Sequence, residues 1–186
     1  MSKESSCSFK TKMKMAGALR NLMMTMPFEK ITVSDITEEC NIHRQTFYYH
    51  FQDRYELLDW FVGKELVEPF VNGINNENFF RRITELLNTM YENKRFYQSA
   101  LKINGAELQD YITRRTKNEF LSIASIITGN EGESRYIISE FLGFGLLGVI
   151  FNWAREGMKK TPEEMTADIA VLTGAFKEFS LKKTNK

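Results

Sequence analysis

The side chains best suited to chemistry lie together in one short stretch, residues 43–52. At about 100° per residue in a helix, Phe47 and Phe51 fall on one side and define a buried face. The other positions carry hydrogen-bonding groups instead of the Lys and Glu usual on a solvated helix: His43, Arg44, Gln45, Thr46, Tyr48, Tyr49 and His50. No acidic residue interrupts them, so this surface can approach base edges and phosphates. The stretch predicts a helix that reads nucleic acid.

Two short helical segments must hold this surface in place. Thr32 followed by Asp35 is an acidic capping box and predicts a helix that begins at Val33. Asn41 can adopt the left-handed conformation that ends a helix. A second helix over residues 43–51 has only two turns, so packing must stabilise it. The pattern predicts a helix–turn–helix whose second helix enters the major groove.

This interpretation gives individual side chains separate roles. Gln45, Thr46 and Tyr49 lie opposite the buried face and, with Arg44, are expected to read bases. The residues expected to contact phosphates are Lys12, Thr32, Tyr48, His50 and Arg54. His43, at the start of the recognition helix, is expected to lie at the same DNA surface. Residues 1–60 hold eight Lys/Arg and eight Asp/Glu, so we expect modest affinity with a strong salt dependence.

Metal binding and catalysis are both disfavoured by the sequence. Cys40 and His43 have C-x-x-H spacing with His50 nearby, but Cys40 falls on the packed face and no fourth ligand is close. No P-loop, GxGxxG, GxSxG or HExxH motif is found, and both histidines lie in the helix–turn–helix. We expect no metal, no cofactor, no catalytic residues and no enzyme activity.

Residues 31–58, ITVSDITEECNIHRQTFYYHFQDRYELL, resemble the DNA-binding domain of TetR-type bacterial transcriptional regulators. The shared features are I-T-V-x-D-I, T-F-Y-x-H-F and D-[KR]-x-E-L-L. Asn41 stands where the family usually has Gly, and His43 replaces the usual Ser or Thr cap, which weakens the start of the recognition helix. The resemblance implies that a helix over residues 53–71 couples this domain to a ligand domain.

The chain as a whole is predicted to be all-α. An N-terminal three-helix DNA-binding domain is expected over residues 8–70. A helical ligand-binding and dimerisation domain is expected over residues 71–186. Its first helices are expected at residues 79–91, 96–103 and 108–127, with a turn at 104–105. Their many aromatic residues either fill a core or line an apolar cavity, and sequence alone leaves both open. The candidate cavity residues are Tyr97, Leu101, Tyr111, Arg115 and Phe144.

The last third contains an uncharged stretch, residues 141–153, which is too short to span a bilayer, so no membrane partner is expected. Thr161, Pro162 and Glu164 then predict a strong helix start. This region is similar to the C-terminal domain of Firmicutes-type family members, which implies a four-helix dimer interface. The expected interface residues are Phe141, Phe144, Gly145, Gly148, Phe151, Trp153, Leu172 and Phe176. The alternative is a core helix within a monomer.

Together these features predict a homodimer. The protein is expected in the cytoplasm, since the two cysteines indicate a reducing compartment and no signal peptide is visible. We expect a repressor that binds a palindromic double-stranded DNA operator and is released by a small-molecule effector. The alternative is an interaction module or activator whose C-terminal domain binds a partner protein. An enclosed apolar pocket would favour the small molecule, and an exposed groove would favour the partner.

Overall fold

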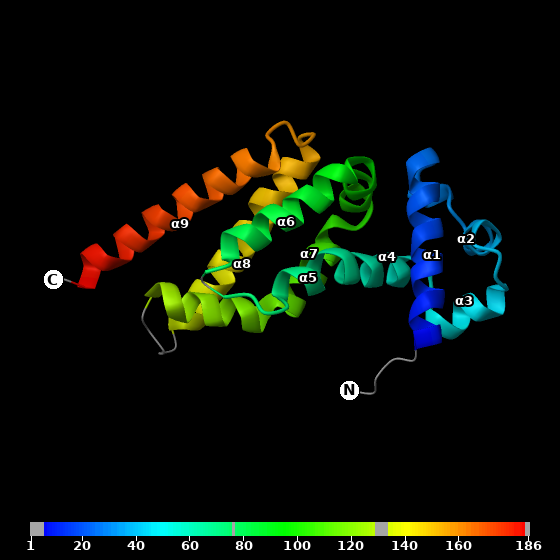
Figure 1. Ribbon diagram of the computed structural model, residues 1–186, viewed down its shortest axis with the longest axis horizontal. Coiled ribbons are helices and arrows are strands. Elements are labelled where there is room, and N and C mark those ends of the chain that lie inside the picture. The colour runs from blue at the N-terminus through cyan, green and yellow to red at the C-terminus, as the bar shows by residue number, and fades with distance from the viewer. Residues whose placement is uncertain (1–5, 76, 129–133, 185–186) are drawn as a thin grey trace.

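The computed structural model describes residues 6–75, 77–128 and 134–184, and these form an all-α protein without a strand (Figure 1), which confirms the predicted fold class. Along the chain the helices are α1 (Ser6–Thr25), the 3-10 turn η1 (Phe28–Lys30), α2 (Val33–Glu39), α3 (Arg44–His50), α4 (Arg54–Val62), the π-turn η2 (Gly63–Val67), α5 (Glu68–Val71), α6 (Phe79–Glu92), α7 (Lys94–Thr128), α8 (Ser134–Arg155) and α9 (Pro162–Thr184). Figure 1 shows α1–α3 grouped at one end of the molecule and α6–α9 at the other, with α4 between them.

The local signals that define the helix–turn–helix are confirmed. Thr32 Oγ1 accepts the N–H of Asp35 at 3.2 Å, and Asp35 Oδ2 accepts the N–H of Thr32 at 2.7 Å. Asn41, with φ of 47°, takes the left-handed conformation just after α2. His43 makes no side-chain cap for α3, which therefore depends on the packing of Phe47, a fully buried residue.

The connecting helix predicted over residues 53–71 is helical from Arg54 to Val71, but it contains a π-turn that the sequence did not predict. It begins as α4, capped by the Asp53 side chain, and widens into the π-turn η2, where the Glu68 N–H donates to the Gly63 carbonyl five residues back. Pro69 has no N–H for the α-helical pattern and stands at the start of α5, which ends at Val71 as predicted. We call α4, η2 and α5 together the connecting helix.

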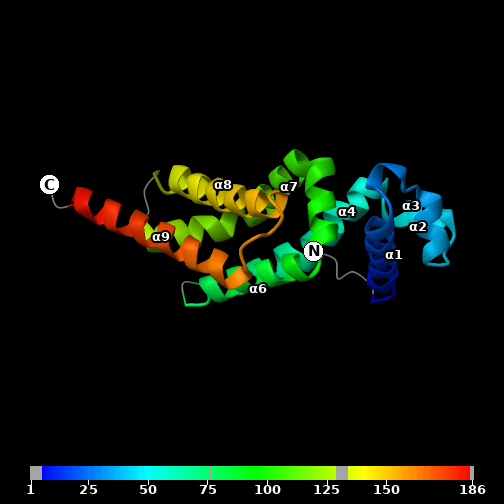
Figure 2. The same cartoon turned by 90° about the horizontal axis from the view of Figure 1, so that it is seen from above.

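The predicted turn at Asn104–Gly105 is wrong, because α7 is helical without interruption from Lys94 to Thr128. A glycine within a helix costs only about 1 kcal/mol, which packing on both flanks offsets. Phe96 and Leu101 are buried before this point, and Leu108 and Ile112 after it. Figure 2 shows that the two halves of α7 nevertheless run in different directions.

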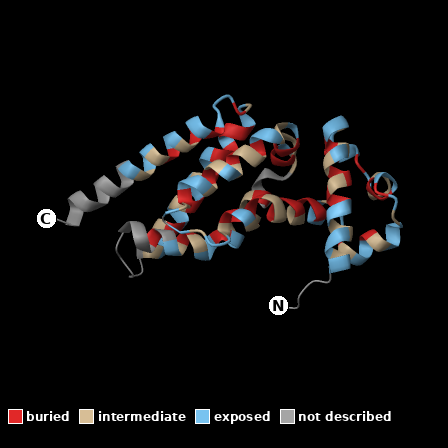
Figure 3. Ribbon diagram, viewed as in Figure 1, coloured by how far each residue is buried: buried red, intermediate tan, exposed pale blue. Residues whose placement is uncertain are grey.

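One continuous hydrophobic core runs from Met15 in α1 to Ile169 in α9, so the two predicted domains share buried contacts. α1 packs on α4, and Figure 3 shows the buried residues of both helices in red. Leu19, Leu57 and Leu58 are fully buried there. The orientation of the helix–turn–helix is therefore tied to the position of the connecting helix.

Residues 135–155 of α8 are long and apolar enough to cross a membrane by length and composition. One face of α8 packs along α7, however, with Leu147, Ile150 and Phe151 buried between the helices and their neighbours. Such burial is usual for the core helix of a folded domain. Other apolar residues of α8, among them Phe141, Phe144 and Val149, lie on an exposed face, which is described below.

Candidate nucleic-acid interface and effector sites

The face of α3 that was predicted to read DNA is presented to solvent. Tyr49 is 83% exposed and Tyr48 is 53% exposed, while Arg44 and Gln45 are also exposed. Thr46 and His50 are half-buried at its edges, and His43 is exposed at the helix start. Residues 43–52 carry no carboxylate, so the face offers only donors, hydroxyls and rings to a polyanion.

The opposite side of α3 fixes this face on the scaffold. Phe47 is completely buried, and Phe51 packs edge-on against Trp60 of the connecting helix at a centroid distance of 5.7 Å. The Tyr49 and His50 rings meet at 4.9 Å in a similar edge arrangement. The reading side chains are therefore carried by a short helix held through its aromatic underside.

The structure gives Thr32 a structural task in addition to the predicted phosphate contact. Its hydroxyl donates to Asp35 Oδ2 at 2.8 Å and also accepts the Asp35 N–H. The hydrogen bonds from the backbone and side chain of Thr32 lower the pKa of Asp35. A phosphate contact through this hydroxyl would compete with the capping box.

Arg54 was predicted to anchor a phosphate, but the structure turns its guanidinium inward. Nη1 donates to the carbonyl oxygens of Phe28 at 3.1 Å, Glu29 at 3.2 Å and Ile31. The guanidinium also stacks 4.8 Å from the centroid of the Phe28 ring. Arg54 therefore ties the start of α4 to η1 and to the residue after it, and sequence alone did not reveal this contact because the partners are more than twenty residues away.

Arg54→Ala should consequently act on stability. We expect the free energy of unfolding to fall by about 1.5–3 kcal/mol, the usual size for hydrogen bonds to a charged group. Arg44→Ala, on the exposed face of α3, is the matched control and should change stability by less than about 0.5 kcal/mol. Urea unfolding followed by circular dichroism measures both, and equal stability of the two variants would contradict the inward role.

Lys12 is also placed differently from the prediction of a phosphate anchor. It is half-buried, and its ammonium lies 5.6 Å from the centroids of both the Phe51 and Trp60 rings. Cation–π contact with two aromatic rings holds this side chain against the underside of the domain. These two contacts link Lys12 to the aromatic underside of α3.

A polar network that sequence analysis missed joins the helix–turn–helix to the C-terminal half. Arg20 of α1 donates to Glu65 Oε1 at 3.1 Å, and the Tyr97 hydroxyl of α7 donates to Glu65 Oε2. Tyr97 is only 1% exposed, and burial, followed by the nearby Glu65 carboxylate, raises its pKa well above the usual range. A buried Tyr needs a hydrogen-bond partner, but nothing in the sequence identifies Glu65 as that partner.

The five predicted cavity residues do not converge on one site. Tyr97 and Leu101 are buried in the core, and Phe144 is exposed on α8. Tyr111 is half-buried with its hydroxyl against Gly63, where a Cβ would clash, and burial raises its pKa. Arg115 lines an open cleft between the connecting helix and α7, and the other four do not.

Among the residues that the structure describes, an apolar space inside the C-terminal half is almost filled. It amounts to about 30 Å³, close to the volume of one water molecule. Phe70, Phe120 and Phe151 close it together with aliphatic side chains from four helical segments. The aromatic residues that could have lined a ligand cavity instead form a core here.

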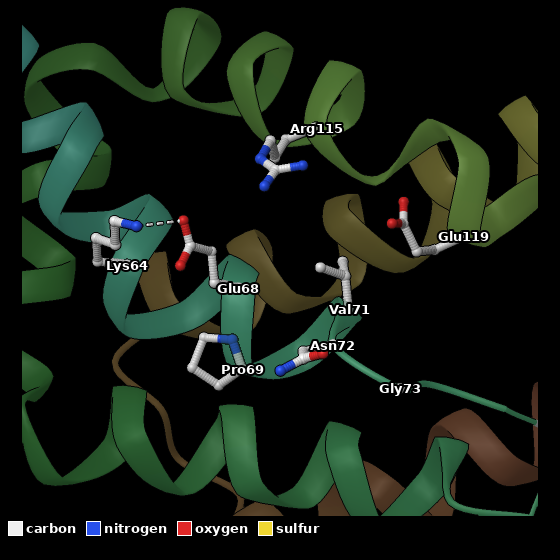
Figure 4. Close-up of a pocket in the computed structure, with 8 residues that line it drawn as sticks. All are labelled: Lys64, Glu68, Pro69, Val71, Asn72, Gly73, Arg115 and Glu119. Carbon is white, nitrogen blue, oxygen red and sulfur yellow. Dashed lines mark ion pairs between the residues drawn. The ribbon is translucent and has the colours of Figure 1, made fainter. Parts of the chain in front are cut away.

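A larger, open cleft of about 670 Å³ lies between the connecting helix and α7 (Figure 4). Its walls are mainly polar, and four of its side chains are charged. The lining residues are Lys64, Glu68, Pro69, Val71, Asn72, Gly73, Arg115 and Glu119. Lys64 and Glu68 form an ion pair of 2.7 Å, and Figure 4 shows Arg115 extending from α7 into the space that faces them.

Part of the predicted dimer surface is exposed in the single chain. Phe141, Phe144 and Leu172 are 59%, 49% and 50% exposed, and Gly145 and Gly148 are exposed beside them. A groove of about 170 Å³ runs between α8 and α9, lined by Phe141, Leu142, Gly145, Leu146, Val149, Ile169, Leu172 and Thr173. We call these exposed residues and this groove the α8–α9 face.

Two predicted dimer residues are wrong, and a third lies beyond the described side chains. Phe151 and Trp153 are buried in the core of their own chain, where the Trp153 indole donates to the Lys160 carbonyl at 3.0 Å and stacks on Tyr91. Phe176 lies outside the residues whose side chains the structure describes. The error arose because a helix that is apolar on all sides gives no periodic signal for its inner face.

The possible zinc set does not form a cluster. Cys40 is buried with its thiol against the Ile36 carbonyl, and burial raises its pKa, which disfavours the thiolate. His43 is exposed at the start of α3. Within the described residues, no group of three or more His, Cys, Asp or Glu side chains could hold a metal ion.

Two protein-family models match the chain. Residues 17–59 match a model described as bacterial regulatory proteins, tetR family, and residues 77–174 match a TetR model described as a transcriptional regulator C-terminal region. A curated relative, the HTH-type dhaKLM operon transcriptional activator DhaS of Lactococcus lactis, is 34% identical over 89 residues. That match covers 48% of this chain and 48% of the relative, so it spans about half the length of each.

A solved structure also resembles this fold. The dihydroxyacetone kinase operon activator DhaS superposes with a TM-score of 0.72 over 91% of this chain and 97% of that chain. The two sequences are 22% identical, so the similarity shows a shared architecture.

Proposed function

This chain belongs to the TetR family of bacterial transcriptional regulators, and we propose that it binds a two-fold symmetric operator as a homodimer through the exposed face of α3. Family members are DNA-binding regulators and are typically not enzymes. The observation that carries the proposal is the acid-free α3 surface with its aromatic underside locked to the connecting helix. Gln45, Thr46, Tyr49 and Arg44 would read bases, and Tyr48, His50 and His43 would contact the backbone.

The experiment that tests this proposal separates base reading from backbone contact. Gln45→Ala should weaken binding to the operator by about 1–3 kcal/mol and change binding to random duplex little, because a glutamine amide pairs with a base edge. Tyr48→Phe should weaken both duplexes alike, since a phenolic hydroxyl on a phosphate carries no sequence information.

Fluorescence anisotropy with the intergenic DNA beside the gene and a scrambled duplex, at two salt concentrations, provides the readout. Equal losses of Gln45→Ala on both duplexes would reject base reading by this residue. Failure of the intact, folded protein to prefer its own intergenic DNA would reject the proposed function.

Dimerisation is supported by the α8–α9 face. Phe141, Phe144 and Leu172 expose apolar surface together with small residues that permit close helix approach. Two copies of this face would pack four helices and place two α3 helices on one duplex, with half-sites about 34–36 Å apart. A regulator of chromosomal DNA would act in the cytoplasm.

One observation favours the activator or protein-partner alternative over a repressor released by an apolar small molecule. The apolar space among the described core residues is nearly filled, whereas ligand sites of small molecules usually occupy about 300–1,000 Å³. The curated relative is named as an operon activator. We therefore propose that an apolar effector does not enter this core, and that the regulatory signal arrives at an outer surface of the C-terminal half.

A further inference from the structure

The cleft between the connecting helix and α7 has the size of a small-molecule site but not the usual apolar lining. Its volume, about 670 Å³, falls within the common range for ligand pockets. Val71 and Pro69 supply apolar contact at its floor, while charged side chains stand on both walls. The polar walls identify the ligand chemistry better than the volume does.

The four charged side chains differ in whether they already have partners. Lys64 and Glu68 neutralise each other on the connecting helix. Arg115 and Glu119, one turn apart on α7, make no side-chain hydrogen bond or ion pair with any residue whose side chain the structure describes. Glu119 Oε2 is buried without a hydrogen-bond partner among those residues. Such a carboxylate oxygen is costly unless a donor reaches it.

We propose that this cleft binds a small zwitterion that carries a carboxylate and an ammonium group. The planar guanidinium of Arg115 matches a carboxylate with two parallel hydrogen bonds, and Glu119 accepts the N–H groups of an ammonium. Side chains four residues apart on a helix start about 5–6 Å apart, so the two ligand charges are joined by a few carbon atoms. A polyanion is excluded because Glu68 and Glu119 would repel it.

The position of the cleft gives the ligand a route to the helix–turn–helix. Lys64 lies in the π-turn η2 next to Glu65, whose carboxylate binds Arg20 of α1. A ligand held between Arg115 and Glu119 would fill the space in front of Lys64 and Glu68, and would therefore act on the same turn that holds the DNA-binding end. This regulatory consequence rests on the proposed function, whereas binding itself does not.

The test is isothermal titration calorimetry of the full chain with a length series of zwitterions: glycine, β-alanine, 4-aminobutanoate, 5-aminopentanoate and 6-aminohexanoate. We expect at least one member to bind with a Kd of about 1 mM or tighter. That member should bind about tenfold more tightly than pentanoate or pentylamine, which each carry one of the two charges.

Substitutions in α7 test which side chains bind the zwitterion. Arg115→Gln should weaken the zwitterion about tenfold, and Glu119→Gln should remove its advantage over pentanoate. Arg114→Gln is the matched control, because Arg114 is exposed, is paired with Asp110 at 2.7 Å and lies outside the cleft. It should leave binding unchanged.

No binding by any member, equal binding of the single-charge analogues, or equal effects of the Arg114 and Arg115 variants would each overturn the inference. Duplex binding is measured separately without any zwitterion. If the folded protein fails to bind its own intergenic duplex, the proposed function alone is overturned. Failure of zwitterion binding and failure of DNA binding are therefore distinguishable.

Discussion

A glutamate in place of Phe144 should leave the protein folded but monomeric, with operator affinity lowered by about 100-fold or more. The Phe144 ring is half exposed on the α8–α9 face, so the substitution disturbs little within one chain. In a dimer it would bury an unpaired carboxylate against apolar side chains, which costs several kcal/mol. Without the dimer, each α3 helix would find its half-site alone and the advantage of two linked contacts would be lost.

Phe80→Glu is the matched control, because Phe80 is a partly exposed aromatic residue on α6 and not on the α8–α9 face. It should remain dimeric with nearly normal affinity. Light scattering coupled to size exclusion gives the mass, and anisotropy gives the affinity. A Phe144→Glu protein that stays dimeric with full operator affinity would show that the interface lies elsewhere.

Glu65→Ala should produce the largest loss of stability among single polar substitutions considered for this chain, about 2–4 kcal/mol. The Glu65 side chain is only 18% exposed and accepts from two helices, α1 and α7. Its removal would leave the hydroxyl of Tyr97, a buried residue, without a partner. The Arg20 contribution is smaller, because its side chain is 37% exposed to solvent.

A double-mutant cycle tests this role of Glu65. Tyr97→Phe removes the orphaned hydroxyl, so Glu65→Ala should cost less in that background than in the wild type, by about 1 kcal/mol or more. Glu68→Ala, which breaks the more exposed Lys64–Glu68 pair, is the control and should cost less than about 1 kcal/mol. Strict additivity of the Glu65 and Tyr97 substitutions in urea unfolding would refute the network.

The helix–turn–helix could be predicted in detail because its signals are local. The Thr32–Asp35 cap, the left-handed Asn41 and the i, i+4 pair of Phe47 and Phe51 each depend on neighbours in sequence. The same is true of the exposed α3 face, which lies opposite two buried rings. These expectations agree with the structure.

Apart from the turn expected at residues 104–105, the errors concern contacts between distant segments. Arg54 was expected to face outward, but its acceptors lie in residues 28–31, and no sequence pattern marks those carbonyls. Tyr97 was expected in a cavity, but its partner Glu65 belongs to another helix. In α8 the inward residue Phe151 and the outward residue Phe144 have the same side chain, so chemistry alone cannot separate them.

The π-turn in the connecting helix has a consequence for chain length. The buried residues Leu57, Phe61, Leu66 and Phe70 are separated by four, five and four positions, an irregular spacing that a regular α-helix would turn partly away from the core. The wider turn at η2 holds the additional residue and keeps both ends of the stripe inward. A regular α-helix one residue shorter at η2 would present the same four buried side chains at an even four-residue spacing, so the inward-facing residues would keep their neighbours.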